Sequence, residues 1–250
     1  MRVLDGFVHG RRIKTSSKRH VDHVGALPAF VGMRGLFGQT DPLTIFCPKA
    51  IEVHLKNGLQ AFQDMQGYEL NVTVQGLLPG DVVALSKRIK LRAFRTYHPA
   101  PSLGYGLFET VNKLKPEFKT LPGDELRRRR LANDSIFTQE ERNYFAYATD
   151  TLPDVLKHEP WLKDVQELMI ECTFLDDKKS VANARRGGHI HLDELKPLLE
   201  SFNNRRVHLM HFSQLYTPKQ VRETFEEPWT KALTPELVPL LPQGDKEWWH

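Results

Sequence analysis

The sequence predicts an α/β fold in which helices cover β-sheets in layers, and three observations support this prediction. Short runs of β-branched and aromatic residues have the length of strands and end at Gly, Pro, Asp or His. Segments with apolar residues at helical spacing lie between these runs. A chain of 250 residues with 40% apolar residues is also long enough to bury the core of such a sandwich.

Strand-like and helix-like segments alternate along most of the chain. The strand-like runs are residues 43–47, 69–74, 89–97, 104–109, 144–148, 167–171 and 207–211. The helical segments are residues 25–37, 49–64, 193–202 and 218–225. Residues 113–134 lack a clean period and are rich in Pro, Gly and charge, so we expect a long connection there. Such connections in compact domains are usually functional or mobile.

Composition limits the classes of protein to which the chain can belong. It has no apolar run near the roughly 18 to 20 residues that cross a membrane, so we expect a soluble protein without a membrane partner. Cys47 and Cys172 are far apart, which is typical of a reducing, intracellular compartment rather than of a disulfide scaffold. A net charge of +4 and a pI of about 9.0 are compatible with a nucleic-acid partner but do not by themselves indicate one.

Imidazole and carboxylate groups stand at or just after the ends of several predicted strands. His98, Asp150 and His211 occupy such positions, and the tetrapeptide His20-x-Asp22-His23 precedes the first helical segment. Open α/β sheets build their sites from groups at the carboxyl ends of strands, and these residue types are zinc ligands. For the tetrapeptide alone, a turn with solvated polar side chains is an equally good interpretation. The ordered set of groups favours a metal site.

These residues and their surroundings resemble ribonuclease Z, the tRNA 3′-end endoribonuclease branch of the metallo-β-lactamase superfamily, in its short plant-type form. The similarity runs from about residue 12 to residue 225, and the segments His-x-x-Pro-Ser-x-Gly-Tyr and Gly-His-x-His-Leu are specific to this branch. The resemblance implies an αββα sandwich. The matching stretches are residues 20–28, 96–105, 147–151, 171–177, 188–192 and 211–213.

The resemblance also implies two zinc ions that share an aspartate and a water. One metal would be held by the residue at position 18 with His20, His98 and Asp150, and the other by Asp22, His23, Asp150 and His211.

The same resemblance implies roles in catalysis for three residues. Asp22 would orient or deprotonate the bridging water, and His189, oriented by Glu171, would donate a proton to the leaving 3′ oxygen. The alternative for His189 is a capping or surface histidine beside Gly187 and Gly188.

Three features depart from the family pattern. Position 18 is Lys18 rather than histidine, and an ammonium group has no lone pair to give to a metal. Lys18 would either place its amine where the first zinc would lie or point to solvent beside a single remaining zinc. We therefore expect at most one intact zinc site. Thr149 replaces a glycine, and residues 3–6 match the family's preceding strands only weakly, so we expect an incomplete first sheet.

An RNA-binding arm is a further implication of the resemblance, and residues 113–134 match its position. Arginine and lysine bind phosphates, so a cluster of them supplies affinity for RNA. The alternative is that the four consecutive arginines form a solvated helix face paired with Asp124 and Glu125. The basic residues of the segment are Lys113, Lys115, Lys119, Arg127, Arg128, Arg129 and Arg130.

We expect a single domain over residues 1–227 and a tail over residues 228–250 that lies over the surface or contacts a partner. The departures favour a catalytically impaired homologue that is a structural or RNA-binding component of a ribonucleoprotein such as an organellar ribosome, with a mitochondrial location favoured. The alternative is an active zinc-dependent endoribonuclease that removes 3′ trailers from tRNA precursors. The expected partners are tRNA or rRNA, proteins that cover the edge of the first sheet, and a second copy or a paralogue in a dimer.

Overall fold

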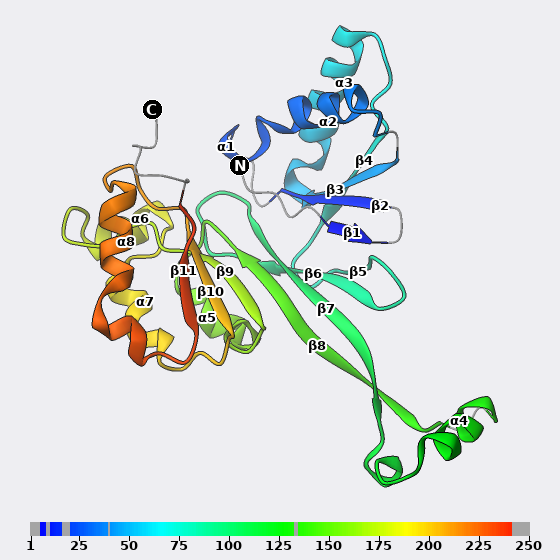
Figure 1. Ribbon diagram of the computed structural model, residues 1–250. Helices are drawn as coiled ribbons and strands as arrows, with labels where there is room; N and C mark the ends of the chain where they lie inside the picture. Colours follow the sequence, from blue (N-terminus) through cyan, green and yellow to red (C-terminus); the bar gives the residue numbers. More distant parts are fainter. Residues whose placement is uncertain (1–5, 9–10, 17–20, 40, 133–134, 242–250) are drawn as a thin grey trace.

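The computed structural model describes residues 6–8, 11–16, 21–39, 41–132 and 135–241, which form two β-sheets with helices on their outer faces (Figure 1). The first sheet has four strands in the order β1-β2-β3-β4, and the second has seven in the order β11-β10-β9-β8-β7-β6-β5. This layering confirms the predicted α/β sandwich. In the described part of the chain the first sheet is the smaller of the two.

The first sheet is built from the N-terminal part of the chain. Strand β1 pairs with β2 in antiparallel register, whereas β2, β3 and β4 run parallel to one another. Two helices, α2 and α3, lie over its outer face (Figure 1). The elements are β1 (Gly6–Val8), β2 (Arg11–Thr15), α1 (Val21–Val24), α2 (Leu27–Leu36), β3 (Leu43–Pro48), α3 (Glu52–Gln66) and β4 (Val72–Leu77), with a 3₁₀ turn at Lys49–Ile51.

The second sheet is mixed, with antiparallel pairing in one half and parallel pairing in the other. Strands β5 to β8 pair in antiparallel register, and β8 to β11 are parallel. Its strands are β5 (Val82–Ala84), β6 (Ile89–Arg95), β7 (Leu103–Leu114), β8 (Phe137–Ala148), β9 (Glu167–Glu171), β10 (Arg206–Met210) and β11 (Glu236–Pro239). Its helices are α5 (Asp154–His158), α6 (Val181–Gly187), α7 (Leu192–Leu199) and α8 (Pro218–Glu226).

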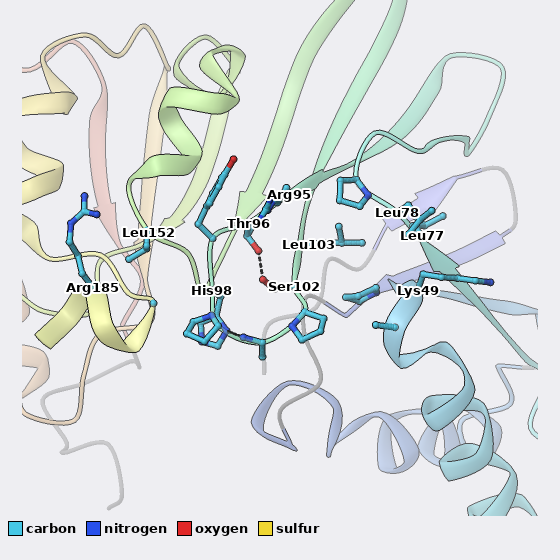
Figure 2. A pocket seen from close by; sticks show the side chains of 18 residues that line it. Lys49, Leu77, Leu78, Arg95, Thr96, His98, Ser102, Leu103, Leu152 and Arg185 are labelled. Carbon is cyan, nitrogen blue, oxygen red and sulfur yellow. Dashed lines mark hydrogen bonds between the residues drawn. The ribbon is translucent and has the colours of Figure 1, made fainter. Parts of the chain in front are cut away.

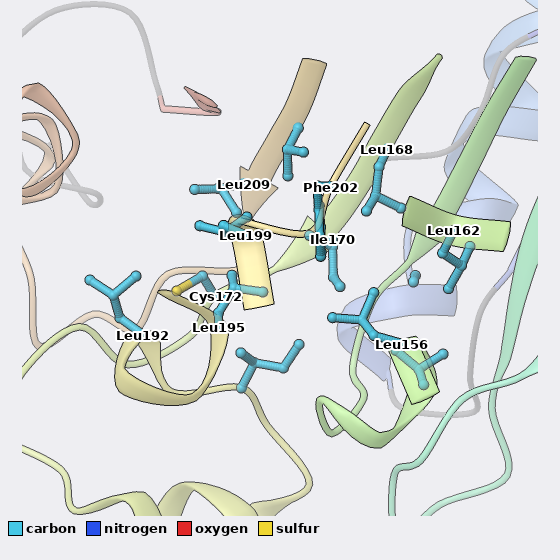
Figure 3. Packing of buried hydrophobic residues seen from close by; sticks show 14 of the residues in the cluster. Leu156, Leu162, Leu168, Ile170, Cys172, Leu192, Leu195, Leu199, Phe202 and Leu209 are labelled. Carbon is cyan, nitrogen blue, oxygen red and sulfur yellow. The ribbon is translucent and has the colours of Figure 1, made fainter. Parts of the chain in front are cut away.

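Three apolar clusters hold the layers together. The largest lies between β8, β9, β10 and helices α5, α7 and α8, where the labelled leucines of Figure 3 pack around Ile170 and Phe202. A second joins the two sheets through Phe46 and Tyr105, and a third packs α2 and α3 on β3 and β4. Burial of these side chains from water is the main stabilising contribution to folding. It also fixes the strand ends that carry the polar groups predicted to form a site.

Strands β7 and β8 are each 12 residues long, well beyond the predicted runs 104–109 and 144–148. Their outer halves form a hairpin that leaves the sandwich and ends at α4 (Gly123–Leu131) after a 3₁₀ turn at Pro116–Phe118 (Figure 1). We call residues 108–143 the arm. The outer part of β8 is exposed over six successive residues, so it lacks the alternating burial pattern that identifies a strand from sequence.

The segment expected to be a tail contributes to the fold as far as residue 241. Strand β11 adds in parallel to β10, after a 3₁₀ turn at Pro228–Ala232. Trp229, Leu233 and Leu237 pack against the largest apolar cluster. The sequence prediction missed this strand because it has only four residues and includes Pro239, which is tolerated at a sheet edge. Within the described ranges, none of the helices has the length and apolar character needed to span a bilayer.

Candidate metal centre

The parallel arrangement of the second sheet brings the predicted groups to one edge. Strands β8, β9 and β10 are parallel, so their carboxyl ends lie together. Strand β6 points the same way as β8, because it is separated from it by two antiparallel pairings. Asp150 follows β8, Glu171 ends β9 and His211 follows β10, while His98 comes three residues after β6.

Asp150 lies at the centre of this edge. Its side chain is fully buried, with Oδ2 3.6 Å from Nε2 of His23 and Oδ1 3.3 Å from Nε2 of His211. Its backbone has a φ of 51°, in the left-handed region that residues other than glycine rarely adopt. The hydroxyl of Thr149 donates a hydrogen bond to Oδ1 of Asp150 over 3.0 Å. Thr149 therefore places a donor on an oxygen that also faces His211.

His211 is held from its other ring nitrogen. Its Nδ1 lies 3.0 Å from the hydroxyl of Thr173, which leaves Nε2 facing Asp150. The backbone of His211 also has a positive φ, 63°. Such a conformation costs about 1 to 3 kcal/mol and persists only where the surroundings enforce it. Two strained residues at one sheet edge are typical of a functional site.

Glu171 connects His189 to the sheet. Nδ1 of His189 lies 3.2 Å from each oxygen of the buried Glu171 carboxylate, which also accepts hydrogen bonds from the backbone N–H groups of Thr151 (2.6 Å) and Ile190 (3.2 Å). Burial would raise the pKa of Glu171, but hydrogen bonding and attraction from His189, attraction from His211 and the Thr173 hydroxyl outweigh it, so the pKa lies below its usual value. The carboxylate thus stays ionised and orients His189.

Gly188 allows the loop before His189 to approach the His98 segment. It has a φ of +78°, and a Cβ there would lie 2.3 Å from Cδ of Pro99. His98 accepts a hydrogen bond from the backbone N–H of Ala100 on Nδ1 over 3.1 Å, so Nε2 is the nitrogen left to bind a ligand. The rings of His98 and His189 lie 5.5 Å apart between centroids.

The ligand atoms of these side chains fall into three groups, within each of which all atoms lie within 4.8 Å of one another. The arrangement fits a zinc site, since imidazole nitrogens and a carboxylate oxygen are its preferred protein ligands. The structure thus brings together His23, His98, Asp150, Glu171, His189 and His211 of the predicted residues. The groups are His23–Asp150–His211, His98–Asp150–His189 and Glu171–His189–His211.

The other predicted residues of the centre precede α1 or lie within it. Lys18 and His20 fall outside the described residues, and so does the side chain of Asp22. The chain is fixed just before them at Ser16, whose N–H donates to the carbonyl of Phe46 over 2.8 Å and whose carbonyl accepts from the Tyr105 hydroxyl over 2.9 Å. Ser16 is thus bound both to β3 of the first sheet and to β7 of the second.

Comparison with known proteins identifies the family of this chain. Residues 16–212 match the family described as beta-lactamase superfamily domain. The chain is 34% identical to tRNase Z TRZ1 of Arabidopsis thaliana over 88% of this chain and 78% of that protein. The chain belongs to the ribonuclease Z family. It is also 29% identical to the chloroplastic tRNase Z TRZ2 of the same plant, over 88% of this chain and 62% of that one.

Solved structures extend the likeness to the fold. The short form of human tRNase Z superposes with a TM-score of 0.60 at 15% identity, covering 96% of this chain and 89% of that one. Zn²⁺-bound PqqB from Methylobacterium extorquens has a TM-score of 0.57 at 12% identity, covering 92% and 82%. At these identities the likeness concerns the metallo-β-lactamase fold alone.

The basic segment of this ribonuclease Z homologue lies at the far end of the arm (Figure 1). Both Arg128 (2.7 Å) and Arg129 (3.0 Å) pair with Glu125 within α4, as the helix-face alternative supposed. Arg127 and Arg130 are exposed on the same helix. Lys113 pairs with Glu140 across the hairpin over 3.1 Å. Lys119 is exposed and Lys115 half-buried near the tip.

Sequence reasoning missed two threonines that organise the centre. Thr173 donates to Glu171 and contacts His211, so it links the two groups, and the backbone N–H of Thr151 is a donor to Glu171. Both lie inside stretches that the family resemblance had already marked. A threonine carries no metal-ligand signal of its own, and only its distance to other groups reveals this role.

Proposed function

We propose that this protein is an RNA-binding member of the ribonuclease Z family whose hydrolytic activity is strongly reduced, and that it holds at most one zinc ion. The convergence of His23, Asp150 and His211 within 4.8 Å is the observation that carries the metal part of this proposal. The lysine at position 18 carries the part about reduced activity.

Zinc at this centre would acidify a bound water and stabilise the negative charge that develops on a phosphodiester. His23, Asp150 and His211 would hold it, with Asp22 to orient the water. His189 has Nδ1 on Glu171, which leaves Nε2 to deliver a proton to a leaving oxygen.

Lys18 works against a second ion. It stands where the family has a ligand histidine, beside His20 in the sequence, and its ammonium repels a dication. Without a ligand histidine at position 18, His98 and Asp150 would form only a weak zinc site. In-line displacement with two metals needs both ions, so the loss of one reduces the rate steeply.

The arm supplies the RNA part of the proposal. Arg127, Arg130 and Lys119 are exposed at its tip, far from the centre along the two long strands. Named relatives are tRNases Z, so tRNA or a tRNA-like fold is the proposed partner. With reduced activity, the protein would act as a structural component of a ribonucleoprotein in an organelle such as the mitochondrion.

A second function is favoured by one specific observation. His189 contacts Glu171, and Thr173 contacts both Glu171 and His211, so the described residues form a continuous hydrogen-bonded chain. A chain with this arrangement is equipped for proton delivery. The alternative is therefore an active zinc-dependent endoribonuclease that removes 3′ trailers from tRNA precursors.

Zinc content and cleavage of a precursor tRNA distinguish these functions. We expect about one zinc per wild-type chain and little cleavage, and we expect Lys18→His to bind a second zinc and raise the rate at least tenfold. Lys14→His, which adds a histidine nearby in the sequence, is the control. Two zinc ions in the wild-type protein together with rapid cleavage would establish the active alternative instead. Loss of RNA binding in the arm variants described below tests the RNA part separately.

A further inference from the structure

A cavity of about 650 Å³ opens beside His98 (Figure 2). Its walls come from the loop between β6 and β7, the turn after β4, and the start of the 3₁₀ turn at Lys49. Leu152, Arg185 and Gly188 close it on the side of the metal centre. This volume lies in the range of small-molecule sites, which is about 300 to 1,000 Å³.

The charged side chains that line the cavity are all basic. Lys49 and Arg185 are already neutralised: Lys49 pairs with Glu52, and Arg185 pairs with Glu194 and with Asp154. Arg95 differs, because the described residues offer no carboxylate within ion-pair distance of its guanidinium. Figure 2 shows Arg95 between the other two cations, next to Thr96. Its position makes it the cation that is left to bind an anion.

Arg95 is nevertheless held in place. Its guanidinium lies over the ring of Tyr97, 5.1 Å from the centroid, and Tyr97 in turn stacks on His158 at 5.0 Å. A stacked guanidinium loses less freedom when it binds, and its planar donors match the oxygens of a phosphate. The stack therefore prepares Arg95 for a phosphate group.

The rest of the lining suits a flat, partly polar ring. Four proline rings line the cavity, and proline walls are rigid because the backbone φ is fixed. The hydroxyls of Thr96 and Ser102 are hydrogen-bonded to each other on this surface and provide its polar edge (Figure 2). The four prolines are Pro48, Pro79, Pro99 and Pro101.

We propose that this cavity binds one unpaired nucleotide of an RNA strand, with Arg95 on its phosphate, its base against the proline rings and Ser102 on its polar edge. Arg95 and His98 are three residues apart, which is at most about 10 Å of extended backbone. A nucleotide held here would thus be a close neighbour of the phosphate presented to the metal centre. The inference rests on the proposed function for its ligand, an RNA strand, but not for its geometry.

Binding of adenosine 5′-monophosphate and of inorganic phosphate to the EDTA-treated, full-length protein tests the proposal by calorimetry. Chelation removes phosphate binding to zinc. We expect the wild-type protein to bind the nucleotide more tightly than phosphate. Arg95→Gln should weaken binding of both by about tenfold or more, because a charge-assisted contact is lost. Arg88→Gln, an exposed arginine on the turn before β6, should leave both unchanged.

Ser102→Ala distinguishes recognition of the nucleotide from recognition of the anion. It should weaken the binding of adenosine monophosphate and leave the binding of phosphate unchanged. Equal binding of nucleotide by the wild-type and Arg95→Gln proteins would overturn the proposal, as would equal affinities for nucleotide and phosphate. None of these measurements depends on zinc or on cleavage. Failure of the proposed function, seen in zinc content and precursor cleavage, is therefore distinguishable from failure of this site.

Discussion

The two sheets contribute to the candidate metal centre in different ways. The second sheet supplies Asp150, Glu171 and His211 directly from strand ends, and each is fixed by hydrogen bonds to neighbouring groups. His23 instead comes from α1, a helix of only four residues that follows strand β2 of the first sheet. Lys18, the position that departs from the family pattern, precedes this helix in the sequence.

The difference indicates which ligands a fold can exchange at low cost. A change at Asp150 or Glu171 disturbs buried hydrogen bonds next to the largest apolar cluster, whereas a change before α1 leaves that cluster intact. Departures from a metal site are therefore expected first on the side that the core does not hold. The five predictions below start from this contrast, and the largest expected effect comes first.

Replacement of Asp150 should have the largest effect on metal binding. Asp150→Ala removes the carboxylate shared by two of the three ligand groups, so zinc affinity should fall by more than the 10- to 100-fold typical of losing an outer partner. His23→Ala should cost less, because Asp150 and His211 of the same group remain to hold the ion. Zinc titration with a competing chelator measures both, and His54→Ala on the exposed side of α3 is the control. Equal losses in the two variants would contradict the contrast.

Glu171→Gln should strongly destabilise the protein. Thr151 and Ile190 donate to different oxygens, so the amide would turn its N–H donors toward one of these two N–H groups, at a cost of about 3 kcal/mol in the free energy of unfolding. Urea unfolding in EDTA measures this cost, and Glu236→Gln, at an exposed ion pair on β11, is the matched control.

The same variant has a consequence for pH. The pKa of Glu171 in the folded protein lies below its usual value of 4.5, so its contribution to stability is present above pH 4.5 and is lost as the pH falls below that value. The wild-type protein should therefore lose more stability between pH 6 and pH 4 than Glu171→Gln does. Parallel stability curves for the two proteins would show that folding does not lower the pKa of Glu171.

Removal of the exposed arginines of the arm should weaken RNA binding without changing the fold. Arg127→Ala with Arg130→Ala removes two phosphate-binding charges, so the slope of log K against log salt for single-stranded RNA should fall by about 1.4. Stability should stay within about 0.5 kcal/mol, because surface changes rarely exceed that. Arg128→Ala should have a smaller effect on binding, since Arg128 already pairs with Glu125. An unchanged salt slope would remove the arm from the RNA interface.

The two cysteines report the relative stability of the two sheets. Burial raises the pKa of Cys47 to about 12 and that of Cys172 further still, so neither should react with a thiol reagent at neutral pH in the folded protein. Cys47 belongs to the smaller cluster around the first sheet, and Cys172 to the largest one. In urea below the unfolding midpoint, Cys47 should be labelled first, as mass spectrometry would show. Simultaneous labelling would indicate a single cooperative unit.

The sequence predicted the core strands well and the exposed elements poorly. The run 167–171 coincides with β9, because a strand buried on both faces leaves an uninterrupted apolar signal. The outer halves of β7 and β8 gave no such signal, since both of their faces meet water. Helix α4 was hidden by the same lack of apolar spacing, although its arginines were found.

The candidate centre divides in a similar way. His98, Asp150 and His211 were predicted from their places at strand ends, which a sequence displays directly. The link that Thr173 makes between Glu171 and His211 depends on the pairing of the neighbouring parallel strands β9 and β10, and no spacing along the chain encodes it. The role of Arg95 could not be predicted from the sequence either. It depends on the ion pairs that Lys49 and Arg185 form and that Arg95 does not form with any described residue.

Strand β11 bears on how the molecule is made. The ribosome delivers the chain from its N-terminus, so the first sheet and the arm emerge long before Glu236–Pro239 exists. Until then β10 presents an unpaired edge that includes Val207, Leu209 and Met210, the kind of surface that other nascent chains join. Among the described strands, the one synthesised last is thus the one that closes this edge. During translation, chaperone protection of the second sheet would matter most in the interval before it arrives.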